Sequence, residues 1–135
     1  MNRVGIDIGS TTVKIAILDE QDQIIFSAYE RHFANIQETL RNIIEQAEKE
    51  LGNIDIAPMI TGSGGLAISK HLNIPFVQEV VSVAKSLKNY APQTDVAIEL
   101  GGEDAKIIYF TDGIEQRMNG ICAGGTGSFI DQMAT

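Results

Sequence analysis

The amino-acid sequence predicts an α/β fold, and three observations support this prediction. Short apolar runs of strand-like composition alternate along the chain with segments whose apolar residues follow helical spacing. The order of these elements starts again after 92 residues (99 − 7), counted between two similar acidic, glycine-containing turns. Of the 135 residues, 44% are hydrophobic and 21% are charged. This balance supports a packed core and argues against a disordered chain.

Composition also narrows the class of protein. The net charge of −8 argues against a nucleic-acid-binding surface, which needs clustered Lys and Arg. The single cysteine cannot form an internal disulfide, which fits a reducing compartment. No run approaches the roughly 18 apolar residues of a membrane span, and the N-terminus starts directly on a strand pattern. We therefore expect a cytoplasmic protein that binds neither nucleic acid nor membrane.

The first part of the chain predicts three strands, a helix, and then alternating strands and helices. The clearest helix follows Asn35, a residue that favours the N-cap position, and apolar residues at helical spacing continue to Leu51. Gly52 then ends this helix. The predicted strands are 3–8, 12–19, 23–31 and 54–61, with a brief strand at 75–77, and the predicted helices are 36–51, 66–72 and 79–90.

The second part repeats the beginning of the first. Strands are predicted at 95–100, 105–110 and 114–118, and a helix is predicted to start from Gly124. Chance similarity is an alternative, because glycine and apolar residues are common in strands, but the shared order of elements favours duplication. We predict one complete βββαβαβα unit at 1–92 and the βββα start of a second unit at 93–135.

The turn after the first predicted strand combines a carboxylate, a glycine and hydroxyl groups. Asp7 ends a buried strand, where it can hold Mg²⁺ through water, because magnesium prefers oxygen ligands and keeps several of its waters. Gly9 lets the backbone approach a phosphate closely, since it has no Cβ. The next three residues, Ser10, Thr11 and Thr12, offer hydroxyls and successive N–H groups to an anion. Lys14 either joins them or, by strand alternation, faces solvent.

The equivalent turn of the second unit carries more carboxylates. Gly101 and Gly102 allow the backbone to approach a phosphate closely, because they have no Cβ. Glu103 or Asp104 can orient an attacking water or bind Mg²⁺. Glu99 takes the place of the first turn's aspartate. Two such turns facing each other would hold a triphosphate from both sides, which is most of what phosphoryl transfer requires. The alternative is that both are ordinary glycine turns between strands.

These two turns resemble the phosphate motifs of the actin/Hsp70/sugar-kinase superfamily. Asp7-Ile-Gly-Ser-Thr-Thr is similar to its first phosphate motif, and Glu99-Leu-Gly-Gly-Glu-Asp is similar to its second. The resemblance implies a ribonuclease-H-like α/β fold and ATP binding. The patterns G-x-x-x-x-G-K-[ST] and G-x-G-x-x-G are both missing from the sequence, so the P-loop and Rossmann interpretations lose their main support.

A third segment places the only cysteine just before a glycine-rich helix start. The N–H groups of such a helix start favour an anion, whether a phosphate or a thiolate-ligated cluster, and lower the pKa of a thiol there. A small buried hydrophobe is the alternative role for a lone cysteine. The residues concerned are Cys122, Gly124, Gly125, Thr126 and Gly127.

The run Cys122-Ala-Gly-Gly-Thr-Gly-Ser-Phe resembles the signature of the activators of 2-hydroxyacyl-CoA dehydratases and benzoyl-CoA reductases. The resemblance implies that Cys122 ligates one [4Fe-4S] cluster, which is shared across a homodimer. It also implies that ATP hydrolysis drives transfer of one low-potential electron to a 2-hydroxyacyl-CoA dehydratase-type partner. We expect ATPase activity from the full-length protein and little from residues 1–135 alone, because the adenosine-binding half of the second unit lies beyond them.

The wording Glu99-Leu-Gly-Gly-Glu-Asp-Ala-Lys, with Asn119-Gly-x-Cys-Ala-Gly-Gly-Thr-Gly, resembles the longer, multi-domain activator-related proteins. Two features depart from the compact activators. Glu99 stands where those activators usually have Asp, and the second cluster cysteine expected downstream does not occur within 135 residues. Two other functions stay open: a small-molecule kinase that phosphorylates a sugar or acid, and a non-catalytic interaction domain. Cys122 discriminates against the kinase, which has no need of a thiolate there.

Several residues that often carry chemistry are given structural roles. His32 and His71 have no second ligand at metal spacing, so we expect solvated surface positions. Met118 and Met133 are expected to fill the core rather than bind iron. The run 61–65 is either a structural strand-to-helix turn or a set of small residues that lets the backbone approach a ligand or partner, and we do not count it among the site residues.

Overall fold

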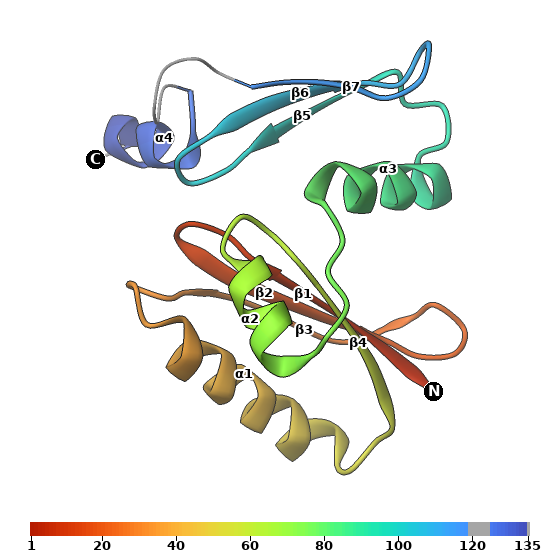
Figure 1. Ribbon diagram of the computed structural model, residues 1–135, viewed down its shortest axis with the longest axis vertical. Coiled ribbons are helices and arrows are strands. Elements are labelled where there is room, and N and C mark those ends of the chain that lie inside the picture. The colour runs from red at the N-terminus through yellow and green to blue at the C-terminus, as the bar shows by residue number, and fades with distance from the viewer. Residues whose placement is uncertain (119–124, 135) are drawn as a thin grey trace. The chain divides into compact units, whose positions relative to one another are not determined.

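The computed structural model describes residues 1–118 and 125–134, which form two compact units, Met1–Val77 and Gln78–Thr135. The predicted boundary at residue 92 follows the sequence repeat, which is a different criterion from packing, and stays a prediction. Each unit contains its own β-sheet (Figure 1). Among the helices of 1–118 and 125–134, none is long and apolar enough to cross a membrane.

The first unit is a four-stranded sheet in the order β3-β2-β1-β4. β1 pairs with β2 and β2 with β3 in antiparallel fashion, while β1 and β4 are parallel. The helix α1 connects β3 at one edge of the sheet to β4 at the other edge, which lets β4 run parallel to β1. The bounds are Asn2–Ile8 (β1), Thr12–Leu18 (β2), Ile24–Arg31 (β3), Ile36–Leu51 (α1), Ile56–Thr61 (β4) and Gly65–Leu72 (α2).

Apolar residues from one face of this sheet and from α1 form the core. The alternation of strand side chains places every second residue of β1 and β2 in it. On α1, the helical spacing of Leu40, Ile43 and Ala47 presents one buried stripe to the sheet. The sheet contributes Val4, Ile6, Ile8, Val13, Ile15, Ile17, Phe26 and Ile60.

The predicted start of α1 is confirmed in its details. The side chain of Asn35 accepts a hydrogen bond from the backbone N–H of Glu38, and its amide donates back to the Glu38 carboxylate at 2.6 Å. This pair of bonds joins the N-cap residue to the third residue of the helix and satisfies one of the free N–H groups in the first turn. Gly52 closes the helix at a φ of 72°, which favours glycine.

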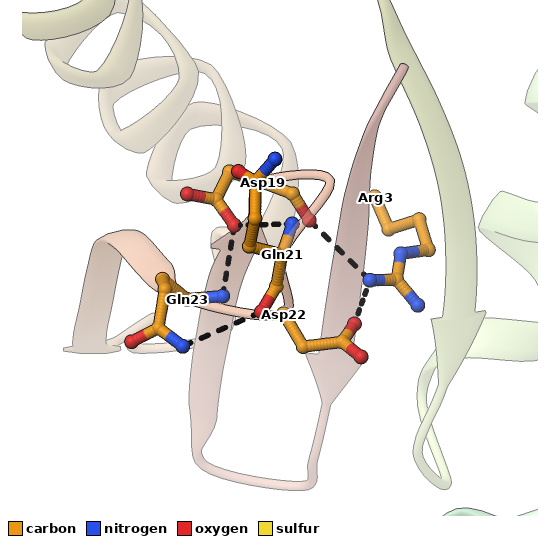
Figure 2. A network of polar contacts seen from close by, with 5 residues as sticks. All are labelled: Arg3, Asp19, Gln21, Asp22 and Gln23. Carbon is orange, nitrogen blue, oxygen red and sulfur yellow. Dashed lines mark hydrogen bonds and ion pairs between the residues drawn. The ribbon is translucent and has the colours of Figure 1, made fainter.

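The turn between β2 and β3 is held by a polar network (Figure 2). The Asp19 carboxylate accepts the backbone N–H groups of Gln21 and Gln23, each at 2.9 Å. Arg3 of β1 forms an ion pair with Asp22 and hydrogen-bonds the Asp19 carbonyl. Both partners of this ion pair are largely exposed, so the pair contributes under about 1 kcal/mol to stability.

Two predicted strand limits need correction. The strand predicted at 54–61 begins only at Ile56, and residue 55 instead accepts the backbone N–H of Asn2. The strand predicted at 75–77 is a single parallel bridge between Ile60 and Phe76. Two hydrogen bonds to Ile60 form this bridge, and the chain then turns directly into α3.

The second unit has a three-stranded antiparallel sheet in the order β5-β6-β7, with one helix before it and one after it. The expected positions of its strands and helices are confirmed within one to three residues. The bounds are Glu79–Tyr90 (α3), Val96–Leu100 (β5), Ala105–Tyr109 (β6), Glu115–Met118 (β7) and Gly127–Ala134 (α4). Met118 and Met133 were predicted to be core residues, but they are 55% and 74% exposed, because β7 and α4 leave them at the surface.

Candidate functional site

The first candidate loop is the tight turn that joins β1 to β2. Asp7 and Lys14 are directly opposite each other in the antiparallel register, and Lys14 Nζ lies 2.9 Å from Asp7 Oδ2. The backbone N–H of Gly9 donates to the carbonyl of Thr12 at 2.9 Å and closes the turn. Lys14 therefore points toward the loop's carboxylate, and its side chain is at the same time 37% exposed to solvent.

Two polar atoms at this end of the sheet are buried without a protein partner. Asp7 and Thr61 are opposite each other at the carboxyl ends of the parallel strands β1 and β4. Asp7 Oδ1 and Thr61 Oγ1 are both buried, and neither has a hydrogen-bond partner among residues 1–118 and 125–134. Buried polar atoms are nearly always satisfied, so this pair indicates a place for water or a ligand. Ligands of open α/β sheets bind at the carboxyl ends of strands.

The glycines around this site differ in whether the folded chain leaves room for a side chain. A Cβ built on Gly9 would have its nearest contacts at 3.6–3.7 Å, an ordinary packing distance, so the folded chain itself does not require glycine there. On Gly62, by contrast, a Cβ would lie 2.3 Å from the Ile8 carbonyl oxygen, and φ is +99°. Gly62 is therefore required by the fold, which supports a structural role for the turn at 61–65.

The second candidate loop repeats the geometry of the first. Glu99 and Lys106 are opposite each other across β5 and β6, as Asp7 and Lys14 are across β1 and β2. The backbone N–H of Gly101 donates to the carbonyl of Asp104 at 2.9 Å, which is the turn-closing bond of the first loop at an offset of 92 residues (101 − 9). The sequence repeat therefore corresponds to a repeated local structure.

Lys106 is the centre of a cluster of charges in the second unit. It is only 5% exposed, and its Nζ hydrogen-bonds Glu79 of α3 at 2.6 Å. The carboxylates of Asp104 and Glu99 lie 3.5 and 3.8 Å from the same nitrogen. Burial by itself would lower the pKa of Lys106, but the Glu79 hydrogen bond and the three carboxylates together raise that pKa above its ordinary value. The cluster keeps Lys106 charged.

The glycine-rich helix start lies directly on the second loop. The backbone N–H of Gly127 donates to the Gly101 carbonyl at 2.7 Å, and the Ser128 hydroxyl donates to the Gly102 carbonyl. A Cβ on Gly101 would lie 2.3 Å from Asp104 Oδ1, the end of a side chain that can turn away, and 3.2 Å from the Asp104 carbonyl oxygen, so the loop leaves little room for a larger residue there. The predicted residues Gly101, Gly102 and Gly127 are thus brought together.

The other predicted site residues differ in exposure. Thr126 is fully buried, Gly125 has a φ of 68°, and Glu103 is exposed. In the first loop, Thr12 is buried, Thr11 is half-buried and Ser10 is exposed. Cys122 and Gly124 lie outside the described residues. Within residues 1–118 and 125–134, no group of three or more His, Cys, Asp or Glu side chains is arranged to hold a metal ion.

Two residues at these loops were missed or misplaced by sequence reasoning. His32 was predicted to be a solvated surface residue, but it is 6% exposed, and its ring contacts the first loop. A histidine just after a strand gives no periodic signal for burial, so the sequence could not show this. Glu79 was predicted only as the start of a helix, and its pairing with Lys106 depends on tertiary packing.

The fold and the paired acidic, glycine-containing turns define a class. The architecture is the ribonuclease-H-like fold of actin-like ATPases, as the resemblance predicted. Within this class, the chain belongs to the BadF/BadG/BcrA/BcrD ATPase family, whose model matches residues 4–135. The predicted resemblance to the dehydratase activators is confirmed.

Three relatives show how similar the chain is to known activators. The (R)-2-hydroxyglutaryl-CoA dehydratase activating ATPase of Acidaminococcus fermentans is 28% identical over 134 residues, which cover 97% of this chain and 52% of that protein. The activator of lactoyl-CoA dehydratase of Anaerotignum propionicum is 32% identical over 139 residues, covering 99% and 53%. Among solved structures, the activator of the 2-hydroxyisocaproyl-CoA dehydratase from Clostridium difficile with bound ADPNP has a TM-score of 0.82. It is 28% identical, and the match covers 99% of this chain and 51% of that one.

The chain spans about half the length of the curated relatives that it matches. The relatives' names therefore describe proteins about twice as long as the part compared.

Proposed function

We propose that this chain forms the phosphate-binding part of an ATP-hydrolysing activator of a 2-hydroxyacyl-CoA dehydratase-type enzyme. In the proposed reaction, ATP hydrolysis is coupled to low-potential electron transfer from a [4Fe-4S] cluster to that partner. The observation that carries the nucleotide part is the pair of buried, unpartnered oxygens, Asp7 Oδ1 and Thr61 Oγ1, beside the first loop. The related activator with bound ADPNP supports the choice of nucleotide.

The residues at the first loop fit a magnesium–phosphate group chemically. Asp7 supplies a carboxylate oxygen that Mg²⁺ would take through water, and magnesium would supply charge neutralisation on the phosphates. The chain's own contribution is positioning: Gly9 leaves room for close approach, and the N–H and hydroxyl groups of 10–12 donate to phosphate oxygens. Lys14 adds a positive charge beside them.

We propose a complementary role for the second loop. Gly101 and Gly102 approach the phosphates with their backbone, while Glu103, Asp104 or Glu99 orients the attacking water or binds magnesium through water. The glycine-rich segment at 124–127 adds backbone N–H groups at a helix start. The contact of Gly127 with Gly101 supports a shared site for these two segments.

Replacing Gly9 with alanine tests the loop directly. Since the folded chain has room for a Cβ there, we expect Gly9→Ala to keep the unfolding temperature of the full-length protein. Its affinity for Mg·ATP should fall by at least about tenfold, measured by calorimetry, because the methyl group occupies the space of a phosphate. Gly5→Ala is the matched control, since Gly5 lies in mid-strand and a Cβ there meets nothing within 4 Å, so this variant too adds a methyl group without a clash. Equal ATP affinity in both variants would contradict the phosphate role of the loop.

The cluster part of the proposal rests on Cys122 and has its own test. Anaerobic reconstitution of the full-length protein with iron and sulfide should give a [4Fe-4S] cluster, shared across a homodimer. We expect Cys122→Ala to lose that cluster, measured by bound iron and sulfide and by the visible absorbance, while Mg·ATP affinity persists. Normal cluster content in Cys122→Ala would exclude this cysteine as a ligand.

A further inference from the structure

The ring of His32 is fully engaged by backbone groups at the edge of the first loop. Its Nδ1 accepts the backbone N–H of Ala34 at 3.0 Å. A neutral imidazole has one donor and one acceptor nitrogen, so the ring proton must be on the other nitrogen. That nitrogen, Nε2, lies 3.1 Å from the carbonyl oxygen of Gly9 and donates to it.

His32 also contacts the loop through its backbone. Its N–H donates to the carbonyl of Thr11 at 3.1 Å, immediately beyond the last register pair of β2 and β3. The carbonyl groups of Gly9 and Thr11, the two neighbours of Ser10, are therefore both hydrogen-bonded by His32, which lies 23 positions after Gly9 in the chain. The conformation of residues 9–11 depends on this residue as well as on the turn itself.

The backbone after His32 is held in a conformation that needs support. Phe33 and Ala34 have φ values of 45° and 64°, in the left-handed region that residues with a Cβ rarely adopt. Such backbone conformations persist only where contacts with the surrounding structure fix them, and they are frequent at functional sites. Here the support is the ring's bond to Ala34 and the bond from the Asn35 N–H to the His32 carbonyl at 2.7 Å. Asn35 in turn caps α1, so the ring connects the helix start to the loop.

The direction of the Gly9 carbonyl determines what the loop offers to an anion. In a trans peptide the C=O and the following N–H point in opposite directions, and this chain has no cis peptide bond among its described residues. Fixing the Gly9 carbonyl toward the buried ring therefore directs the Ser10 N–H away from that ring, and Ser10 is an exposed residue. The same bond keeps a carbonyl oxygen, which would repel a phosphate, turned inward.

We propose that His32 is a positioning residue that presets the Ser10 amide as a donor to a nucleotide phosphate. This inference rests on the proposed function of the loop. His32 acts through Gly9 rather than on the phosphate, because its ring is buried and both nitrogens are already used. Its contribution should appear in ATP affinity and in KM, with kcat little changed.

Two polar variants of His32 test the two hydrogen bonds of its ring separately. The amide nitrogen of His32→Gln can reach the position of Nε2 and donate to Gly9. The shorter His32→Asn can accept from Ala34 at the position of Nδ1 but cannot reach the Gly9 carbonyl. In the full-length protein we expect His32→Gln to keep Mg·ATP affinity within about threefold. For His32→Asn we expect Mg·ATP affinity to fall about tenfold and KM for ATP to rise about tenfold. The kcat of both should stay within about twofold of the wild type.

His71→Asn is the matched control, because His71 is exposed on α2. Circular dichroism and thermal unfolding establish that each variant is folded. Equal affinity in the glutamine and asparagine variants, whether both are unchanged or both are weakened, would overturn the role of the Nε2–Gly9 bond. A wild-type protein without measurable ATP affinity would instead overturn the proposed function, and this inference with it.

Discussion

Replacing Asp7 with asparagine is expected to lower the magnesium-dependent ATPase activity of the full-length protein by at least about 100-fold, or about 2.7 kcal/mol in activation free energy. Asparagine has the same shape as aspartate but no charge, so it cannot hold hydrated Mg²⁺ comparably. It also leaves the Lys14 ammonium without its anion, because Lys14 Nζ pairs with Asp7 Oδ2 at 2.9 Å. Steady-state phosphate release at several magnesium concentrations measures the effect.

This loss should come from chemistry and not from unfolding. The Asp7 and Lys14 side chains are 33% and 37% exposed, so their ion pair is screened by solvent and contributes under about 1 kcal/mol to stability. Asp22→Asn is the matched control. Asp22 also pairs with a cation, Arg3, but it lies at the β2–β3 turn (Figure 2).

The possible outcomes separate the competing functions. ATPase activity of Asp7→Asn equal to that of Asp22→Asn would exclude the first loop as a magnesium site. ADP formation that requires an added sugar or acid acceptor would favour a small-molecule kinase. A protein that binds no nucleotide at all would favour a non-catalytic interaction domain.

Much of the fold could be predicted because its signals are local. The apolar stripe of α1, its N-cap at Asn35 and the alternating residues of β1 and β2 are local patterns that neighbouring residues determine. The loops were predictable for another reason: a repeat in sequence implies a repeat in hydrogen bonding. The bonds from Gly9 to Thr12 and from Gly101 to Asp104 are that repeat.

The residues that sequence reasoning misplaced, such as His32, or did not place, such as Lys106, are those whose environment is tertiary. His32 is buried because a loop 23 positions earlier in the chain receives its ring, and nothing around residue 32 encodes that loop. Lys106 lies in the run Ala-Lys-Ile-Ile-Tyr, where alternation alone cannot decide which face is buried. The structure buries Lys106 together with Ile108, and only the carboxylates of other elements make that burial possible.

Lys106→Met is expected to destabilise the second unit by about 3 kcal/mol, because it removes the cation from a cluster of three carboxylates. Methionine preserves much of the volume of lysine, so the cost is electrostatic rather than a cavity. Hydrogen exchange of the β6 amides in the native protein measures this local free energy without requiring two-state unfolding of the whole chain. Lys88→Met, at an exposed position of α3, controls for the loss of one positive charge.

The pH dependence follows from the direction of the pKa shift. The pKa of Lys106 is raised in the folded state, so its stabilising contribution is complete below the ordinary lysine pKa of about 10.4. That contribution is lost as the pH rises through the higher folded-state value. The wild type should therefore lose stability in this alkaline range, and Lys106→Met should lose less over the same range.

Because of the repeat, Lys14 is a better control for the Lys106 substitution than any surface lysine. Lys14 occupies the equivalent position in the first unit, but its side chain is 37% exposed and pairs with one carboxylate. The side chain of Lys106 is 6% exposed and lies near three. Because burial and the number of uncompensated charges determine the cost, Lys14→Met should lose under about 1 kcal/mol where Lys106→Met loses about 3. Equal losses at the two positions would mean that the shared hairpin geometry, and not the buried charge cluster, determines the stability of these loops.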